Sequence, residues 1–106
     1  MRFQPTNDFN KAAKRLAKKY ASLFNDLDML FESLNENPFQ GAPLGGNTYK
    51  VRLAIASKGK GKSGGARVIT CVKIVDDVIH LLTIYDKSEI KNITDEYLDE
   101  LKKWTQ

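Results

Sequence analysis

Apolar residues in the first third of the chain recur at every third or fourth position, which is the spacing of helices that bury one face. Two such stripes follow each other, consisting of Phe9, Ala13, Leu16, Ala17 and Tyr20 and then of Leu23, Leu27, Leu30, Phe31 and Leu34. The first stripe predicts a helix that Asn7 or Asp8 caps. The second predicts a helix that ends before Pro38, because proline lacks a backbone donor. A break near Ala21 and Ser22 makes the pair a helical hairpin.

A period of two replaces this spacing in the middle of the chain, as in strands that bury one face. Apolar residues alternate with polar or basic ones over residues 49–55 and again over residues 67–74, and a loop rich in Gly and Lys joins the two segments. On the first strand Lys50 and Arg52 share one face, and Arg67 opens the second strand. The pattern predicts a rigid antiparallel hairpin that carries basic side chains.

A third strand is predicted over residues 78–85, after a tight turn at Asp76 and Asp77. Its residues are mostly apolar, so we expect it to be central and covered on both faces. Thr94 is expected to cap a last helix. The apolar stripe of that helix consists of Tyr97, Leu98, Leu101 and Trp104. A brief strand at residues 2–4 is expected to pair at an edge of the sheet.

These elements predict an α+β fold with an N-terminal two-helix hairpin packed on a mainly antiparallel sheet of three to four strands, followed by a C-terminal helix. Residues 38–46 are rich in Pro and Gly and are predicted to be the loop between the hairpin and the sheet. With 106 residues the chain suffices for one modest core, so we expect a single domain over residues 1–106.

Charge is arranged in blocks along the chain, with net values of +5 for residues 1–20, −4 for residues 21–47, +7 for residues 48–75 and −4 for residues 76–106. The third block holds seven basic residues and no acidic one. The first helix and the central hairpin therefore predict a positive surface on which a polyanion docks through its phosphates.

Several classes of protein are disfavoured by the sequence. It has no stretch of about 18 apolar residues, so no membrane partner is expected. The N-terminus lacks the apolar core of a secretory signal and the single cysteine, Cys71, has no partner for an internal disulfide, so we expect a cytoplasmic protein. The segment GKGKS, residues 59–63, looks like the end of a phosphate-binding P-loop, but that motif requires glycine where Ala56 stands.

Three segments resemble the RelE-type toxins of bacterial type II toxin–antitoxin systems, which form part of the RelE/ParE superfamily. They are YKVR at residues 49–52, SGGARVI at residues 63–69 and IYDKSE at residues 84–89. With the order of the two helices, the resemblance covers nearly the whole chain and implies a RelE-like fold with a curved sheet. It implies a toxin that cuts messenger RNA, usually in the ribosomal A site, and so inhibits translation. It also implies a cognate antitoxin as partner.

The resemblance implies catalytic residues as well. Arg67 matches the arginine that binds the scissile phosphate, and Arg52 matches a basic position on the adjacent strand. Lys87 stands where the family sets a basic residue at the end of the last strand, as phosphate ligand or proton donor. Tyr85, two residues before Lys87, is expected to share its face and to stack on a base or help move a proton. The residues expected to bind RNA more generally are Lys50, Lys58, Lys60 and Lys62.

The expected chemistry requires neither a metal nor another cofactor. The 2′-hydroxyl of RNA is tethered beside the phosphate that it attacks. An enzyme then has to align the groups, move two protons and stabilise the charge that builds on the phosphate, and arginine suits the last task. Two alternatives remain open, namely a non-nucleolytic ParE-type toxin that binds DNA gyrase and a catalytically inactive module that binds RNA or an antitoxin.

Overall fold

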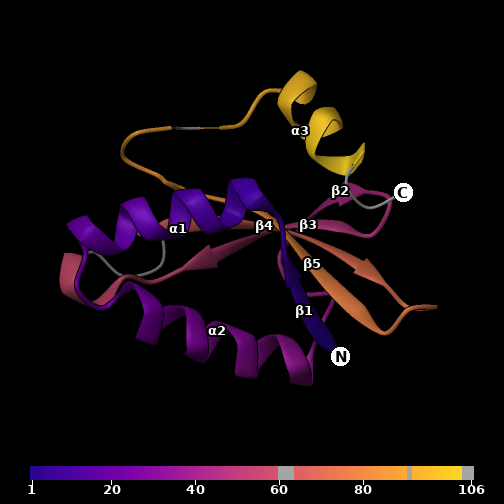
Figure 1. Cartoon of the computed structure of the whole chain (residues 1–106), viewed down its shortest axis with the longest axis horizontal. Helices are drawn as coiled ribbons and strands as arrows, with labels where there is room; N and C mark the ends of the chain where they lie inside the picture. Colours follow the sequence, from indigo (N-terminus) through magenta and orange to yellow (C-terminus); the bar gives the residue numbers. More distant parts are fainter. Residues whose placement is uncertain (60–63, 91, 104–106) are drawn as a thin grey trace.

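A mixed sheet in the strand order β1-β5-β4-β3-β2 forms the centre of the molecule in the computed structural model, which describes residues 1–59, 64–90 and 92–103 (Figure 1). Its strands are β1 (Arg2–Pro5), β2 (Ala42–Gly45), β3 (Thr48–Leu53), β4 (Ala66–Lys73) and β5 (Val78–Asp86). The helices are α1 (Asn7–Lys19), α2 (Leu23–Glu36), a short 3-10 turn (Ala56–Lys58) and α3 (Asp95–Lys102). The α+β fold predicted from the sequence is confirmed.

The sheet has one strand more than predicted. The expected edge strand is β1, which pairs in parallel with β5, whereas all other neighbours are antiparallel. The unexpected strand is β2, which lies in the Pro/Gly-rich segment predicted to be a loop and pairs with the start of β3. Edge strands of four residues are short enough to escape a periodicity test. With both edges present, β4 is the middle strand, and β5 lies inside the sheet between β1 and β4.

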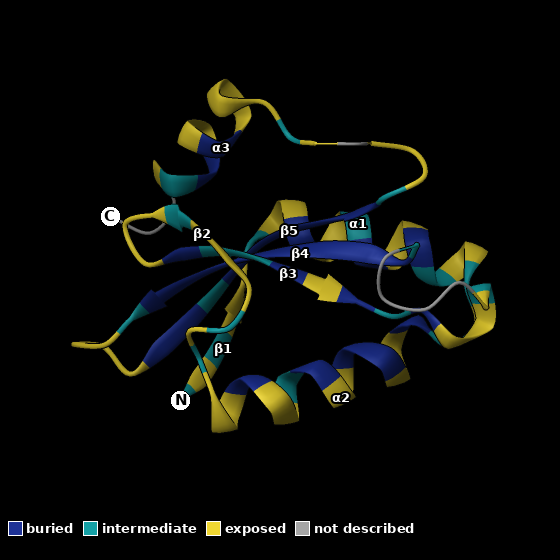
Figure 2. Cartoon of the chain, turned by 180° about the vertical axis from the view of Figure 1, so that it is seen from behind, coloured by how far each residue is buried: buried dark blue, intermediate teal, exposed yellow. Residues whose placement is uncertain are grey.

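Helices α1 and α2 cover one face of the sheet and α3 covers part of the other (Figure 1). The larger core joins Phe9 and Leu16 of α1 and Leu27 of α2 to strand residues such as Val68. The smaller core joins Leu98 and other α3 residues to the opposite face of β4 and β5. These two strands are therefore buried along most of their length (Figure 2), as expected for strands covered on both sides.

Side-chain caps fix where α1 and α3 begin. The Thr6 hydroxyl accepts a hydrogen bond from the Phe9 amide (3.0 Å) and donates one to the Leu82 carbonyl (2.7 Å). Thr6 is thus the cap of α1, and the expectation of Asn7 or Asp8 was wrong because the helix begins earlier than the apolar stripe. The predicted cap of α3 is confirmed, since the Thr94 hydroxyl accepts from the Tyr97 amide (3.1 Å).

A bulge in β5 interrupts the alternation of its side chains. Thr70 of β4 pairs with Leu81, but Ile69 pairs with Thr83, so Leu82 is an extra residue on β5. Leu81 accordingly belongs to the core under α1 and α2, whereas Leu82 belongs to the core under α3. The bulge shifts all later pairs by one position and thereby sets Tyr85 opposite Arg67.

Candidate functional site

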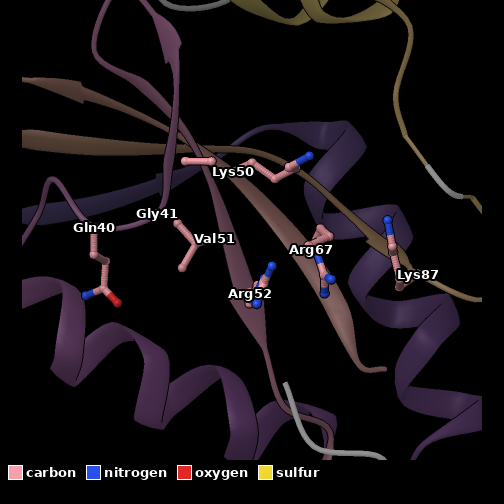
Figure 3. Close-up of a pocket in the computed structure, with 8 residues that line it drawn as sticks. Gln40, Gly41, Lys50, Val51, Arg52, Arg67 and Lys87 are labelled. Carbon is pink, nitrogen blue, oxygen red and sulfur yellow. The ribbon is translucent and has the colours of Figure 1, made fainter. Parts of the chain in front are cut away.

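A row of three functional candidates crosses the sheet on the face that carries α3. Arg52 of β3 pairs directly with Arg67 of β4, and Arg67 pairs with Tyr85 of β5. Directly paired residues share a face, and Lys87 follows Tyr85 by two positions. Figure 3 shows Arg52, Arg67 and Lys87 next to one another across the strands. The structure therefore brings together residues that stand up to 35 positions apart in the sequence.

Three of these residues and Lys50 line a hollow of about 510 Å³, which we call the cationic hollow. Its lining consists of Gln40, Gly41, Ala42, Lys50, Val51, Arg52, Arg67 and Lys87 (Figure 3). Half of these residues are basic, and none of the described residues that line the hollow is acidic. Converging cations in a concave site attract an anion, and arginine grips phosphate oxygens in pairs. The lining of the hollow therefore suits an anionic group such as a phosphate.

The arrangement costs stability. Like charges directly opposite each other on neighbouring strands are destabilising, and Arg52 and Arg67 are such a pair. Arg67 is also only 5% exposed, so its guanidinium has lost most of its water. A hydrogen bond from Nη1 to the Ala66 carbonyl (3.0 Å) orients the group along its own strand. Two arginines paired directly across neighbouring strands are unusual enough to make this position a candidate functional site.

Tyr85 stands at the end of this row, beside Arg67, but does not line the cationic hollow. It is 3% exposed, and its hydroxyl has no hydrogen-bond partner among the described residues. Burial raises the pKa of Tyr85, and the charge of Arg67 offsets part of that rise. The phenol is therefore neutral at physiological pH. At this exposure the ring offers little surface for stacking on a base, and the part of Tyr85 in the chemistry stays a prediction.

The two lysines of the hollow are anchored in different ways. Lys50 Nζ lies 3.3 Å from the Asn92 side-chain oxygen, in the segment between β5 and α3. The Lys87 amide donates to the Gly65 carbonyl (3.1 Å), which extends the pairing of β4 and β5 past the end of the strand. Lys87 is thus fixed at the end of β5, as predicted.

Lys58 does not lie in the hollow. Its ammonium contacts the carboxylate of Asp86 at 2.6 Å, and the two side chains are 8% and 0% exposed. Tyr20 and Ser88 also donate to this carboxylate, each at 2.7 Å. Burial alone would raise the pKa of Asp86, but the hydrogen bonds from Lys58, Tyr20 and Ser88 outweigh burial and hold it far below its usual range. The ammonium of Lys58 is therefore engaged by Asp86, and its role in RNA binding stays a prediction.

Some sequence-derived candidates fall elsewhere. Lys60 and Lys62 lie outside the described residues. Asp86 and Gln40 were not predicted as parts of the site region. The signal for Asp86 was its position between the candidates Tyr85 and Lys87 in the IYDKSE segment. In the described parts of the chain, no group of three or more His, Cys, Asp or Glu side chains is placed to hold a metal ion. No described helix is both long and apolar enough to span a bilayer.

Comparison with known proteins places this geometry in a family context. The family model described as the RelE toxin of the RelE/RelB toxin–antitoxin system matches residues 1–106. Among solved structures, the chain is similar to an E. coli RelE toxin with two arginine-to-alanine changes, described in the free state. The two have a TM-score of 0.62 at 17% sequence identity, and the match covers 99% of this chain and 97% of that one. At this identity the structural match supports the fold.

Proposed function

Because this chain belongs to the RelE toxin family, we propose that it is a ribosome-dependent endoribonuclease that cleaves messenger RNA and so inhibits translation. The observation that carries the proposal is the cationic hollow, in which Arg52, Arg67 and Lys87 converge although the sequence separates them. Membership in this family means that the chain is a toxin of a toxin–antitoxin system. The cationic hollow supports the finer assignment to phosphate chemistry.

The proposed reaction uses the substrate's own nucleophile. The 2′-oxygen forms a bond to the adjacent phosphorus while the bond from phosphorus to the 5′-oxygen breaks, which leaves a 2′,3′-cyclic phosphate and a 5′-hydroxyl. Arg67 and Arg52 would bind the non-bridging oxygens and stabilise the charge that accumulates on them. Lys87 would give a proton to the departing 5′-oxygen, while the 2′-hydroxyl passes its own proton to a water molecule. Tyr85, buried beside Arg67, would act through Arg67 and not by contacting RNA.

Exposed lysines outside the cationic hollow support binding of ribosomal RNA. Lys11, Lys14 and Lys18 are exposed on α1 and carry charge that the fold does not require for packing. Such side chains bind phosphates in a way that depends on salt and not on sequence. An acidic segment of the cognate antitoxin would compete for the same positive surface.

The decisive experiment incubates the protein with ribosomes that are programmed with a defined message. We expect fragments cut in the A-site codon that end in a 2′,3′-cyclic phosphate. Arg67→Lys keeps the charge but not the paired geometry and should lower cleavage by about 100-fold, whereas Arg2→Lys, on the distant edge strand β1, should not. Intact message with the unaltered protein would overturn the proposal, and gyrase-dependent DNA damage would then favour a ParE-type toxin.

A further inference from the structure

A second hollow, of about 390 Å³, lies between α2 and the edge of β3. We call it the α2 hollow. In the described part of the chain β2 pairs with β3 no further than Lys50, so the following residues of β3 border the opening. Most of its lining is apolar, and Asp26 and Ser33 add polar groups on the side of α2. The apolar residues are Met29, Leu30, Leu53, Ala54 and Ala56. Gln40 and Arg52 line both hollows, so an apolar compartment adjoins the cationic one.

The side chain of Gln40 is held in one orientation at this junction. Its Nε2 donates to the Ser33 hydroxyl (2.9 Å) and to the Asn37 carbonyl (3.1 Å). The Asn37 carbonyl only accepts, so the nitrogen of the carboxamide has to face it. In Figure 3 the oxygen of Gln40 is on the side toward Arg52. A fixed acceptor therefore stands beside the row of cations.

The backbone next to Gln40 is fixed as well. Gly41 has φ +103°, and a Cβ there would lie 2.6 Å from the Lys50 carbonyl oxygen. Only glycine permits this close approach of the segment to β3. A residue that recognises a ligand has to be held in position before the ligand binds. The side-chain contacts and the backbone provide this for Gln40.

We propose that the α2 hollow binds the base of a nucleotide whose phosphate lies in the cationic hollow, and that Gln40 accepts a hydrogen bond from that base. This inference rests on the proposed ribonuclease function. A nucleotide consists of a flat base with polar edges joined to an anionic phosphate. The α2 hollow matches the base, and the cationic hollow matches the phosphate. The exposed Met29 provides a polarisable side chain for contact with the ring.

The chemistry of the acceptor predicts which bases are preferred. Adenine, cytosine and guanine carry an exocyclic amine that donates to the Gln40 oxygen. The exocyclic groups of uracil are both carbonyl oxygens, which face an acceptor unfavourably. One neutral hydrogen bond supports a preference of about three- to tenfold for amine-bearing bases over uracil at one position next to the cleaved bond.

The test compares cleavage of ribosome-bound messages that differ only in the bases of the A-site codon. Gln40→Met keeps the size of the side chain and removes the acceptor, so it should abolish the preference while cleavage of uracil-containing sites persists. Gln4→Met, on the exposed face of β1, is the matched control and should leave the preference intact. Ser33→Ala removes one of the two contacts that hold the amide and should weaken the preference in part.

The outcomes separate this inference from the proposed function. A protein that cuts no message overturns both. Cleavage with a base preference that Gln40→Met and Ser33→Ala leave unchanged overturns the inference alone. If the preference is unchanged but the antitoxin neutralises Gln40→Met more weakly than the unaltered protein, the α2 hollow binds an apolar side chain of the antitoxin instead.

Discussion

Arg52 and Arg67 lie directly opposite each other on β3 and β4, so two permanent positive charges share one position of the sheet. Neighbouring strands rarely hold such a pair, because the charges repel and nothing in the ladder of backbone hydrogen bonds relieves them. An anion between the two guanidinium groups would turn the repulsion into attraction for both. The pair therefore stores part of the free energy that binding of a phosphate releases.

Replacing Arg52 should separate stability from activity. In Arg52→Thr the repulsion disappears and a residue that favours strands takes its place, so we expect the free energy of unfolding to rise by up to about 1 kcal/mol while cleavage is lost. Urea unfolding and the ribosome assay measure the two effects. Arg2→Thr, an exposed strand position away from the hollow, should change neither. A less stable Arg52→Thr protein would contradict the idea that the pair is strained.

Asp86 should be the most sensitive polar position of the fold. Asp86→Asn leaves the ammonium of Lys58 buried without its counter-charge, which we expect to cost about 3 kcal/mol or more in the free energy of unfolding. Lys58→Met should cost less, because Tyr20 and Ser88 still donate to the carboxylate. Asp76→Asn, in the exposed turn between β4 and β5, is the control, and its effect should stay below about 0.5 kcal/mol.

The same carboxylate predicts how stability depends on pH. The pKa of Asp86 is far lower in the folded protein than its ordinary value of 3.8. The unfolded chain therefore binds this proton first as the pH falls, so the contribution of Asp86 is complete above about pH 5 and is lost progressively below that pH. Unfolding measured from pH 6 to pH 2 should show the difference between the unaltered protein and Asp86→Asn shrinking toward acid. A constant difference would exclude this origin.

Tyr85 offers a test of a buried hydroxyl without a described partner. In Tyr85→Phe the ring that fills the core under α3 is kept and the hydroxyl is removed, so stability should stay the same or rise by about 1 kcal/mol. Because Tyr85 lies beside Arg67 and does not line the cationic hollow, cleavage should change by less than about tenfold. Tyr85→Ala should instead cost about 3 kcal/mol or more, through the cavity it leaves. A Tyr85→Phe protein that folds normally but lacks activity would show that the hydroxyl takes part in the chemistry.

The helices, four of the five described strands and the cations of the hollow could be predicted from the sequence, mainly because periodicity and charge are local properties. The functional assignment of Arg67, Arg52 and Lys87 came from the family resemblance, and the structure adds that their side chains converge. The apolar stripes predicted the helices correctly for the same reason. The cap of α1, Thr6, lies one residue before Asn7, the first of the two predicted caps.

Other features depend on contacts between distant segments and escaped prediction. The ion pair of Lys58 with Asp86 joins residues 28 positions apart, and nothing near Lys58 distinguishes it from the other lysines of its loop. Gln40 lies in a Pro/Gly-rich stretch whose composition suggests only a loop. Its place beside Arg52 follows from the close contact of Gly41 with β3.

The bulge at Leu82 gives β5 two independent registers. The residues before it satisfy the hydrophobic core under α1 and α2, and those after it place Tyr85 in the row of Arg67. In a homologue that lacks one residue at this point, the tyrosine would still pair with the arginine of β4, and only the bulge would be absent. A sequence alignment without a gap in this strand would then match residues that are not equivalent in the structure. Members of the family should therefore be aligned by which residue of β5 pairs with the arginine of β4.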